Sequence, residues 1–174
     1  MASVLELSPI SINTHEGGSS ASIRLFQLTL NNVTVELSSL GASVTKVLLP
    51  DYSQNVSTPE EELHRDDVVL SYASPKDQYE DKNKPFFGAI VGRVANRIKG
   101  GRFELFQTKQ SSTDTVNALE AYQLDTNDGQ NHLHGGYDGF CNRLWSAEII
   151  DDTVSIQFTL ISPDGDQGYP GGIK

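Results

Sequence analysis

Polar side chains that could bind a small polyol gather in two short stretches of residues 88–136. An apolar run leads to Asn96 and Arg97, and a loop rich in Asn, Asp and Gly leads to His132 and His134 just before two glycines. Amide, guanidinium and imidazole groups presented together can hydrogen-bond a polyol from several directions, and glycine lets a ligand approach the backbone closely. These residues therefore predict a small-molecule binding site.

A metal site is the first alternative. In extended backbone His132 and His134 would point to the same side, which suits metal coordination. The other two histidines, His15 and His64, lie in Gly-rich or acidic surroundings, and Asp138 is the nearest carboxylate. A complete shell of three or four ligands is hard to assemble from this set, so we expect no metal.

A purely structural role is the second alternative. Either imidazole could hydrogen-bond only its own loop, and this holds more strongly for His132. Arginine often ties a loop by donating to backbone carbonyls, so one of Arg93 and Arg97 is expected to do only that. Cys141 has no recognisable base partner and follows a phenylalanine, which predicts a half-buried, inert thiol.

The composition excludes several classes of protein. The chain has 174 residues, with 13 Lys and Arg against 23 Asp and Glu and a formal net charge of −10. Binding to nucleic acid or anionic membranes requires clustered cations, so neither partner is expected. One cysteine permits no internal disulfide, and neither a signal-peptide pattern nor a membrane-length apolar run is present. We expect a cytoplasmic protein.

Short alternating segments separated by Gly, Pro and Asn predict an all-β protein. Residues 33–38 alternate between apolar and polar, and with residues 26–30 they predict a hairpin across Asn31 and Asn32. Residues 145–150 and 153–161 predict a second hairpin by the same pattern. Further strands are predicted at residues 44–49, 67–72, 86–91 and 101–106.

The remaining segments predict loops. Residues 1–22 are mixed, Gly17–Ser20 within them predict a flexible loop or tail, and strand signals begin at Ile23. Residues 51–66 and 74–85 predict polar loops. Residues 107–121 predict an extended surface loop with a short helical turn near its end. No segment has a sustained helical period, and no repeat or linker is visible, so residues 1–174 are expected to form a single unit.

Several segments, in order, resemble the aldose 1-epimerase (galactose mutarotase) family: LSSLGASVTKVLLPD, DVVLSYAS, FFGAIVGRVANRIKGGRFEL, NHLHGGYDGF, LWSAEI and ISPDGDQGYPG. The match runs from about Phe26 to Gly171. The resemblance implies an antiparallel β-sandwich of the galactose mutarotase-like type with an open sugar cleft. It also implies interconversion of the α and β anomers of free hexoses such as glucose and galactose, by acid–base ring opening without a metal or organic cofactor.

Individual residues can be carried over by motif. Asn96 and Arg97 of ANRI resemble the family's substrate-binding pair, and His134 of LHGG resembles the histidine that contacts the sugar and helps to polarise its ring oxygen. The family's principal acid His and base Glu lie beyond the SPDGxxGYPG-type loop, and this sequence ends at Lys174. The resemblance thus predicts the N-terminal portion of such a domain, an incomplete sandwich with little or no turnover alone.

Two other functions are compatible with the same residues. The first is a carbohydrate-binding module that keeps Asn96, Arg97 and His134 but performs no chemistry. The second is a hexose-phosphate epimerase on the same fold, for which Lys99 and Arg102 would supply the basic groups.

Overall fold

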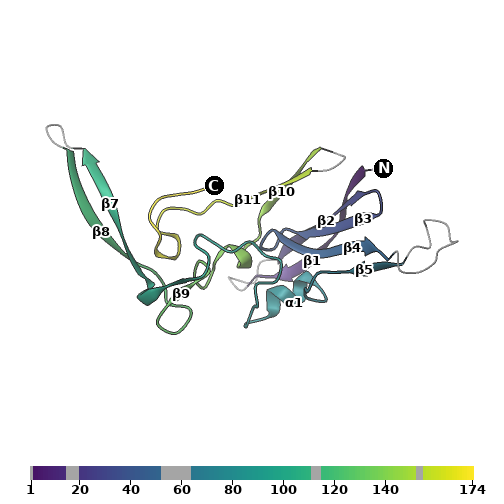
Figure 1. Ribbon diagram of the computed structural model, residues 1–174, viewed down its shortest axis with the longest axis horizontal. Coiled ribbons are helices and arrows are strands. Elements are labelled where there is room, and N and C mark those ends of the chain that lie inside the picture. Colours follow the sequence, from purple (N-terminus) through teal and green to yellow (C-terminus); the bar gives the residue numbers. More distant parts are fainter. Residues whose placement is uncertain (1, 15–19, 52–63, 111–114, 152–154) are drawn as a thin grey trace. The chain divides into compact units, whose positions relative to one another are not determined.

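The computed structural model describes residues 2–14, 20–51, 64–110, 115–151 and 155–174. They belong to two compact units. The first unit comprises Met1–Ile90 and Cys141–Leu160, and the second comprises Val91–Phe140 and Ile161–Lys174. In both units the paired strands are antiparallel, and the described residues contain one short α-helix (Figure 1), which confirms the prediction of an all-β fold.

The first unit is built on a five-stranded antiparallel sheet of order β1-β2-β3-β4-β5. Its strands are β1 (Ala2–Asn13), β2 (Ser20–Leu30), β3 (Val33–Ser38), β4 (Ser43–Pro50) and β5 (Arg65–Asp67). The predicted hairpin is confirmed, because β2 and β3 pair across a turn in which Asn31 has φ 54°. The expectation that strands begin only at Ile23 is wrong. Residues 2–13 form an edge strand along β2, and residues 15–19 lie outside the described residues.

The two faces of this sheet have different neighbours. On one face, buried Ile12, Ile23 and Leu40 form a cluster against which Tyr79 of helix α1 (Pro75–Glu80) packs. Strand alternation places Phe26 on the opposite face. There its ring meets Phe158 edge to face, with the centroids 5.9 Å apart.

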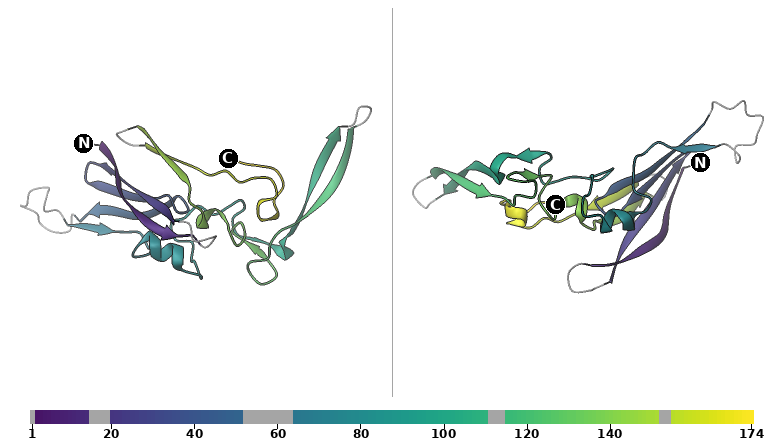
Figure 2. Two further views of the ribbon diagram at one scale, coloured as in Figure 1. Left: turned by 180° about the vertical axis from the view of Figure 1, so that it is seen from behind. Right: turned by 90° about the horizontal axis from the view of Figure 1, so that it is seen from below.

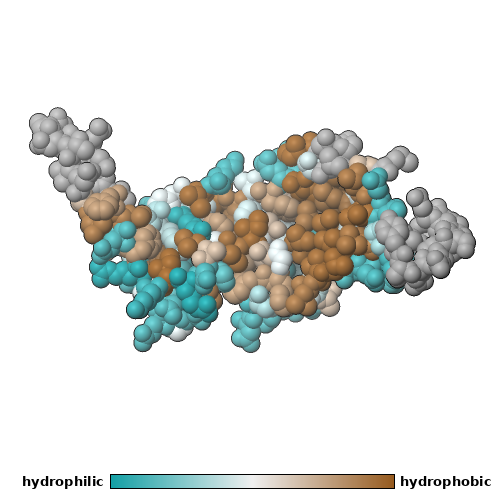
Figure 3. Space-filling view, in the orientation of Figure 1, coloured by the Kyte–Doolittle hydropathy of each residue, from teal (hydrophilic) through white to brown (hydrophobic). Residues whose placement is uncertain are grey.

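Phe158 belongs to the second predicted hairpin, which is confirmed as β10 (Ser146–Asp151) paired with β11 (Ser155–Thr159) and can be followed in Figure 2. The hairpin covers only part of its face of the sheet. Figure 3 shows apolar side chains gathered over the five-stranded sheet. Leu30, Val33 and Leu49, which alternate onto the Phe26 face, are exposed.

The second unit contains two short ribbons. Strand β6 (Arg97–Ile98) pairs with β9 (His132–Leu133), and β7 (Arg102–Gln110) pairs with β8 (Thr115–Gln123). Three 3₁₀ helices complete the elements of the described chain: η2 (Lys99–Gly101), η3 (Phe140–Asn142) and η4 (Asp166–Gly168).

The expected surface loop at residues 107–121 is wrong, because this segment continues the β7–β8 hairpin. Its pairing runs from Arg102 opposite Gln123 to Gln110 opposite Thr115. The polar composition hid these strands, since backbone pairing requires no apolar alternation. An aromatic cross-strand pair lies at the base of the ribbon, where Phe103 stacks on Tyr122 at 5.4 Å. The tip, residues 111–114, lies outside the described residues.

Three further expectations are corrected. The apolar run at residues 86–91 is not a strand, because Phe86 and Gly88 have φ of 63° and 62° and break the extended backbone. Residues 68–72 are irregular, since β5 ends at Asp67, and the polar segment 74–85 contains α1, whose N-cap is Ser74. Of the loop expected at residues 51–66, positions 52–63 are outside the described residues. No helix in the described ranges is long and apolar enough to cross a membrane.

Replacing Phe26 tests how the first unit is held together. Phe26 is fully buried between β1, β3 and Phe158. Phe26→Ala should therefore lower the free energy of unfolding by about 3–5 kcal/mol, measured by urea denaturation. The control is Phe106→Ala on β7, where 79% of the residue is exposed and the change should stay within about 0.5 kcal/mol. Equal losses in the two variants would contradict this packing.

Candidate binding site

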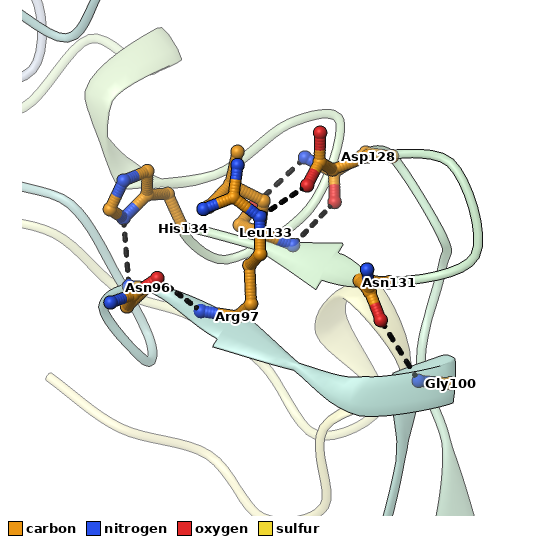
Figure 4. A network of polar contacts seen from close by, with 8 residues as sticks. Asn96, Arg97, Gly100, Asp128, Asn131, Leu133 and His134 are labelled. Carbon is orange, nitrogen blue, oxygen red and sulfur yellow. Dashed lines mark hydrogen bonds and ion pairs between the residues drawn. The ribbon is translucent and has the colours of Figure 1, made fainter.

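The two predicted site segments meet in the β6–β9 ribbon of the second unit. Arg97 lies opposite Leu133, and Ile98 lies opposite His132. The side chain of Asn127 bonds both backbone polar groups of Leu133. Its Nδ2 donates to the Leu133 carbonyl at 2.9 Å, and its Oδ1 accepts from the Leu133 amide at 2.8 Å. This ribbon is short, so the polar bonds around it determine where the site residues lie (Figure 4).

Asn96 and His134 interlock at the end of this ribbon. The backbone amide of Asn96 donates to Nδ1 of His134 at 2.9 Å, and the backbone amide of His134 donates to the backbone carbonyl of Asn96 at 3.1 Å. Both residues have positive φ, 63° and 49°, a region where Asn and His are enriched among non-glycine residues. Because Nδ1 accepts a hydrogen bond, the proton of the neutral ring is on Nε2, so the ring presents an N–H donor.

The surroundings of His134 favour this neutral state. Partial burial, with a smaller contribution from the Arg97 guanidinium, lowers the pKa of His134 below its ordinary value. At neutral pH the ring is therefore mainly uncharged, with Nε2–H as a hydrogen-bond donor.

Arg97 is held by a carboxylate. Its Nε donates to Oδ2 of Asp128 at 2.5 Å, and 53% of the side chain remains exposed. Asp128 is fixed in turn by two backbone hydrogen bonds with Asn131, each 3.0 Å. Oδ1 of Asn96 accepts from the Arg97 amide at 2.9 Å, which orients the Asn96 side chain. The arrangement presents amide, guanidinium and imidazole donors together.

Sequence reasoning missed the residues that support this group. Asn127 and Asp128 lie in the polar segment LDTNDGQN, and Asn and Asp commonly stabilise turns through side-chain hydrogen bonds. That signal identified a loop without indicating that these side chains hold Arg97 and Leu133.

His132 does not join His134, although in an extended backbone the two rings would point to the same side. The positive φ of His134 turns the chain away from extended conformation immediately after β9. His132 is fully buried, and its two ring nitrogens contact the Asp125 carbonyl at 2.6 Å and the Tyr169 hydroxyl at 2.8 Å. No group of three His, Cys, Asp or Glu side chains within the described ranges is arranged to hold a metal ion.

Arg93 is the arginine that ties a loop, as expected of one of the pair. Its guanidinium donates to the carbonyls of Ser162, Pro163 and Pro170 and to Oγ of Ser162, at 2.6–3.1 Å. Gly135 is structural as well. It has φ 90°, and a Cβ atom there would overlap the Gly92 carbonyl oxygen. Cys141, in the first unit, is buried rather than half-buried as expected.

An open hollow of about 600 Å³ lies at the base of the β7–β8 hairpin. Its lining residues are Lys99, Gly100, Arg102, Phe103, Glu104 and Gln123. Arg102 is paired with Glu104 at 3.1 Å, so part of its charge is already compensated. Lys99 and Arg102 are the basic residues that the hexose-phosphate alternative requires.

Comparison with known proteins adds independent information. The sequence model of the aldose 1-epimerase family matches residues 24–174. The chain is 37% identical over 152 residues to galactose mutarotase of Rattus norvegicus, covering 87% of this chain and 37% of that protein. It is 34% identical over 149 residues to aldose 1-epimerase of Escherichia coli K12, covering 84% of this chain and 36% of that protein.

The fold agrees with this similarity. A crystal structure of galactose 1-epimerase from Lactobacillus acidophilus NCFM superposes with a TM-score of 0.68 at 26% identity, covering 99% of this chain and 42% of that one. The expected galactose mutarotase-like fold class is therefore confirmed. The chain spans about 37% of the length of the mammalian mutarotase that it matches.

The lowered pKa of His134 predicts a specific pH dependence. Protonation would place a proton on Nδ1 and break the bond from the Asn96 amide. The His134 ring of the unfolded chain binds this proton at a higher pH than the ring of the folded chain does. The contribution of the neutral ring to the free energy of unfolding is therefore complete above about pH 6.5, and it declines as the pH falls toward the lower pKa of the folded state. NMR titration of the His134 ring signals should give a midpoint below about 6.5. A midpoint at or above that value would contradict the interlocked geometry.

Proposed function

Because the chain belongs to the aldose 1-epimerase family, we propose that it binds free hexoses such as glucose and galactose through Asn96, Arg97 and His134. In this proposal the site serves an enzyme that interconverts the α and β anomers of the sugar. The observation that carries it is the interlock of Asn96 and His134 beside Arg97. It gathers three different donor groups from two segments more than 30 residues apart in sequence.

Each residue has a role that its chemistry supports. The neutral His134 ring donates from Nε2 toward the ring oxygen of the sugar, which polarises the bond that opens. The exposed guanidinium of Arg97, steadied by Asp128, donates to sugar hydroxyls, and the side-chain Nδ2 of Asn96 adds a further donor.

Anomer exchange also needs two proton transfers. A base removes the proton from the anomeric hydroxyl, and an acid protonates the ring oxygen, so that the ring opens to the free aldehyde and can close on either face. The proposal gives His134 an auxiliary part as polarising donor. It assigns these transfers to groups other than Asn96, Arg97 and His134. A cytoplasmic setting is part of the proposal and is supported by a single cysteine in 174 residues.

NMR of the purified chain with glucose or galactose tests binding and exchange together. We expect sugar-dependent shifts of the Asn96, Arg97 and His134 signals. His134→Ala should weaken binding by roughly tenfold, since a lost hydrogen bond in a partly buried site costs about 1–1.5 kcal/mol. The matched control is His64→Ala, which removes an exposed histidine of the first unit and should leave the shifts unchanged.

The outcomes separate the functions. Anomer exchange above the buffer rate, lost in His134→Ala, would mean that this chain itself catalyses the reaction. Shifts without exchange would favour sugar binding alone. Absence of any sugar-dependent shift in the folded chain would contradict the proposal.

The hexose-phosphate alternative is tested with the same spectra. If the phosphate group is recognised at Lys99 and Arg102, hexose 6-phosphate should bind at least tenfold more tightly than free hexose, and Lys99→Ala should remove the difference. Our proposal predicts similar affinities for both ligands, and no effect of Lys99→Ala on free hexose.

A further inference from the structure

The proposed roles leave one buried pair of polar rings in the second unit without a function. His132 and Tyr169 are 0% and 5% exposed, and their ring centroids lie 5.2 Å apart at an angle of 75°. A buried polar side chain costs free energy unless its hydrogen bonds are made, so their arrangement is informative.

The partners of His132 determine where its proton lies. The Asp125 carbonyl can only accept, so Nδ1, 2.6 Å away, carries the proton. In the neutral ring Nε2 is then an acceptor, and the Tyr169 hydroxyl, 2.8 Å away, donates to it. Burial raises the pKa of Tyr169 to about 12, although the nearby Arg93 lowers it in part, so the phenol keeps its proton at neutral pH. The result is a directed chain of hydrogen bonds from Tyr169 through His132 to the backbone.

Tyr169 is itself held firmly. Its backbone amide donates to the Asp166 carbonyl at 2.9 Å, and its carbonyl accepts from the Gly165 amide at 2.8 Å. The Arg93 guanidinium lies 5.7 Å from its ring centroid and donates to the next carbonyl along the chain, that of Pro170. The phenol therefore reaches His132 from a loop that is tied at several points.

The other end of this chain of bonds is strand β9. His132 is its first residue, Leu133 is opposite Arg97, and His134 follows immediately. A displacement of His132 must move β9, and with it the His134 ring that meets Asn96. We propose that Tyr169 is a positioning residue of the hexose site, because its bond to His132 fixes the strand that presents His134. This inference rests on the proposed function for the sugar, but the geometry can be tested without one.

Tyr169→Phe removes only the phenol oxygen and leaves Nε2 of His132 buried without its donor. The matched control is Tyr72→Phe in the first unit, which likewise removes a phenol hydrogen bond, the one to Asp81 at 2.7 Å. Both variants are measured in the 174-residue chain by NMR, first without sugar and then with galactose. We expect Tyr169→Phe to shift the His134 ring signals and to weaken galactose binding by roughly tenfold, the lower end of the loss found when residues that orient metal-binding side chains are replaced. Tyr72→Phe should change neither, even if it lowers stability as much.

The results distinguish this inference from the proposed function. Shifted His134 signals in Tyr169→Phe, with no galactose binding even by the unmodified chain, would support the positioning role and reject the hexose site. Unchanged His134 signals and unchanged galactose affinity in Tyr169→Phe would overturn the positioning role. A further readout does not require a folded variant. ¹⁵N NMR of the unmodified chain should show His132 protonated on Nδ1 with Nε2 as acceptor, and a proton on Nε2 alone would also overturn it.

Discussion

The reciprocal pair of hydrogen bonds between Asn96 and His134 is the constraint on which the candidate site depends. Each residue uses its backbone amide to bond the other, one to a ring nitrogen and one to a carbonyl. The pair joins two distant segments, selects the Nε2–H form of the imidazole and sets it beside the Arg97 guanidinium. Replacing His134 would remove the ring acceptor and the Nε2–H donor, whereas replacing Asn96 would remove its side-chain amide and a residue type that tolerates positive φ.

Polar bonds, more than apolar packing, hold this group in place. Asn127 holds the backbone of Leu133, Asp128 holds Arg97, and the Tyr169 phenol holds His132 from the loop that Arg93 ties down. The first unit is different, since its sheet depends on buried apolar side chains such as Phe26 and Ile23. Polar networks specify geometry closely when every member is satisfied, which suits a site that must present donors at fixed positions.

The sequence predicted the parts of the fold that show a regular pattern. The hairpins β2–β3 and β10–β11 follow from alternation and turn residues, and several segments in order, from LSSLGASVTKVLLPD to ISPDGDQGYPG, identified the family to which the chain belongs. Prediction failed where backbone conformation overrides composition. Positive φ at Phe86 and Gly88 interrupts an apolar run, and cross-strand pairing turns a polar stretch into β7 and β8.

The same limit applies within the site. Spacing alone placed His132 and His134 on one side, whereas the positive φ of His134 separates them. The supporting roles of Asp128 and Tyr169 depend on contacts between segments that are distant in the sequence, which spacing along one segment does not reveal.

The most direct test of this account is the protonation site of the His134 ring, read by ¹⁵N NMR above its pKa. We expect an unprotonated Nδ1 that accepts from the Asn96 backbone amide and a protonated Nε2 whose signal moves when galactose is added. A proton on Nδ1 with a bare Nε2 would contradict it, because the Asn96 amide would have lost its acceptor and the ring could not donate from Nε2 to the sugar.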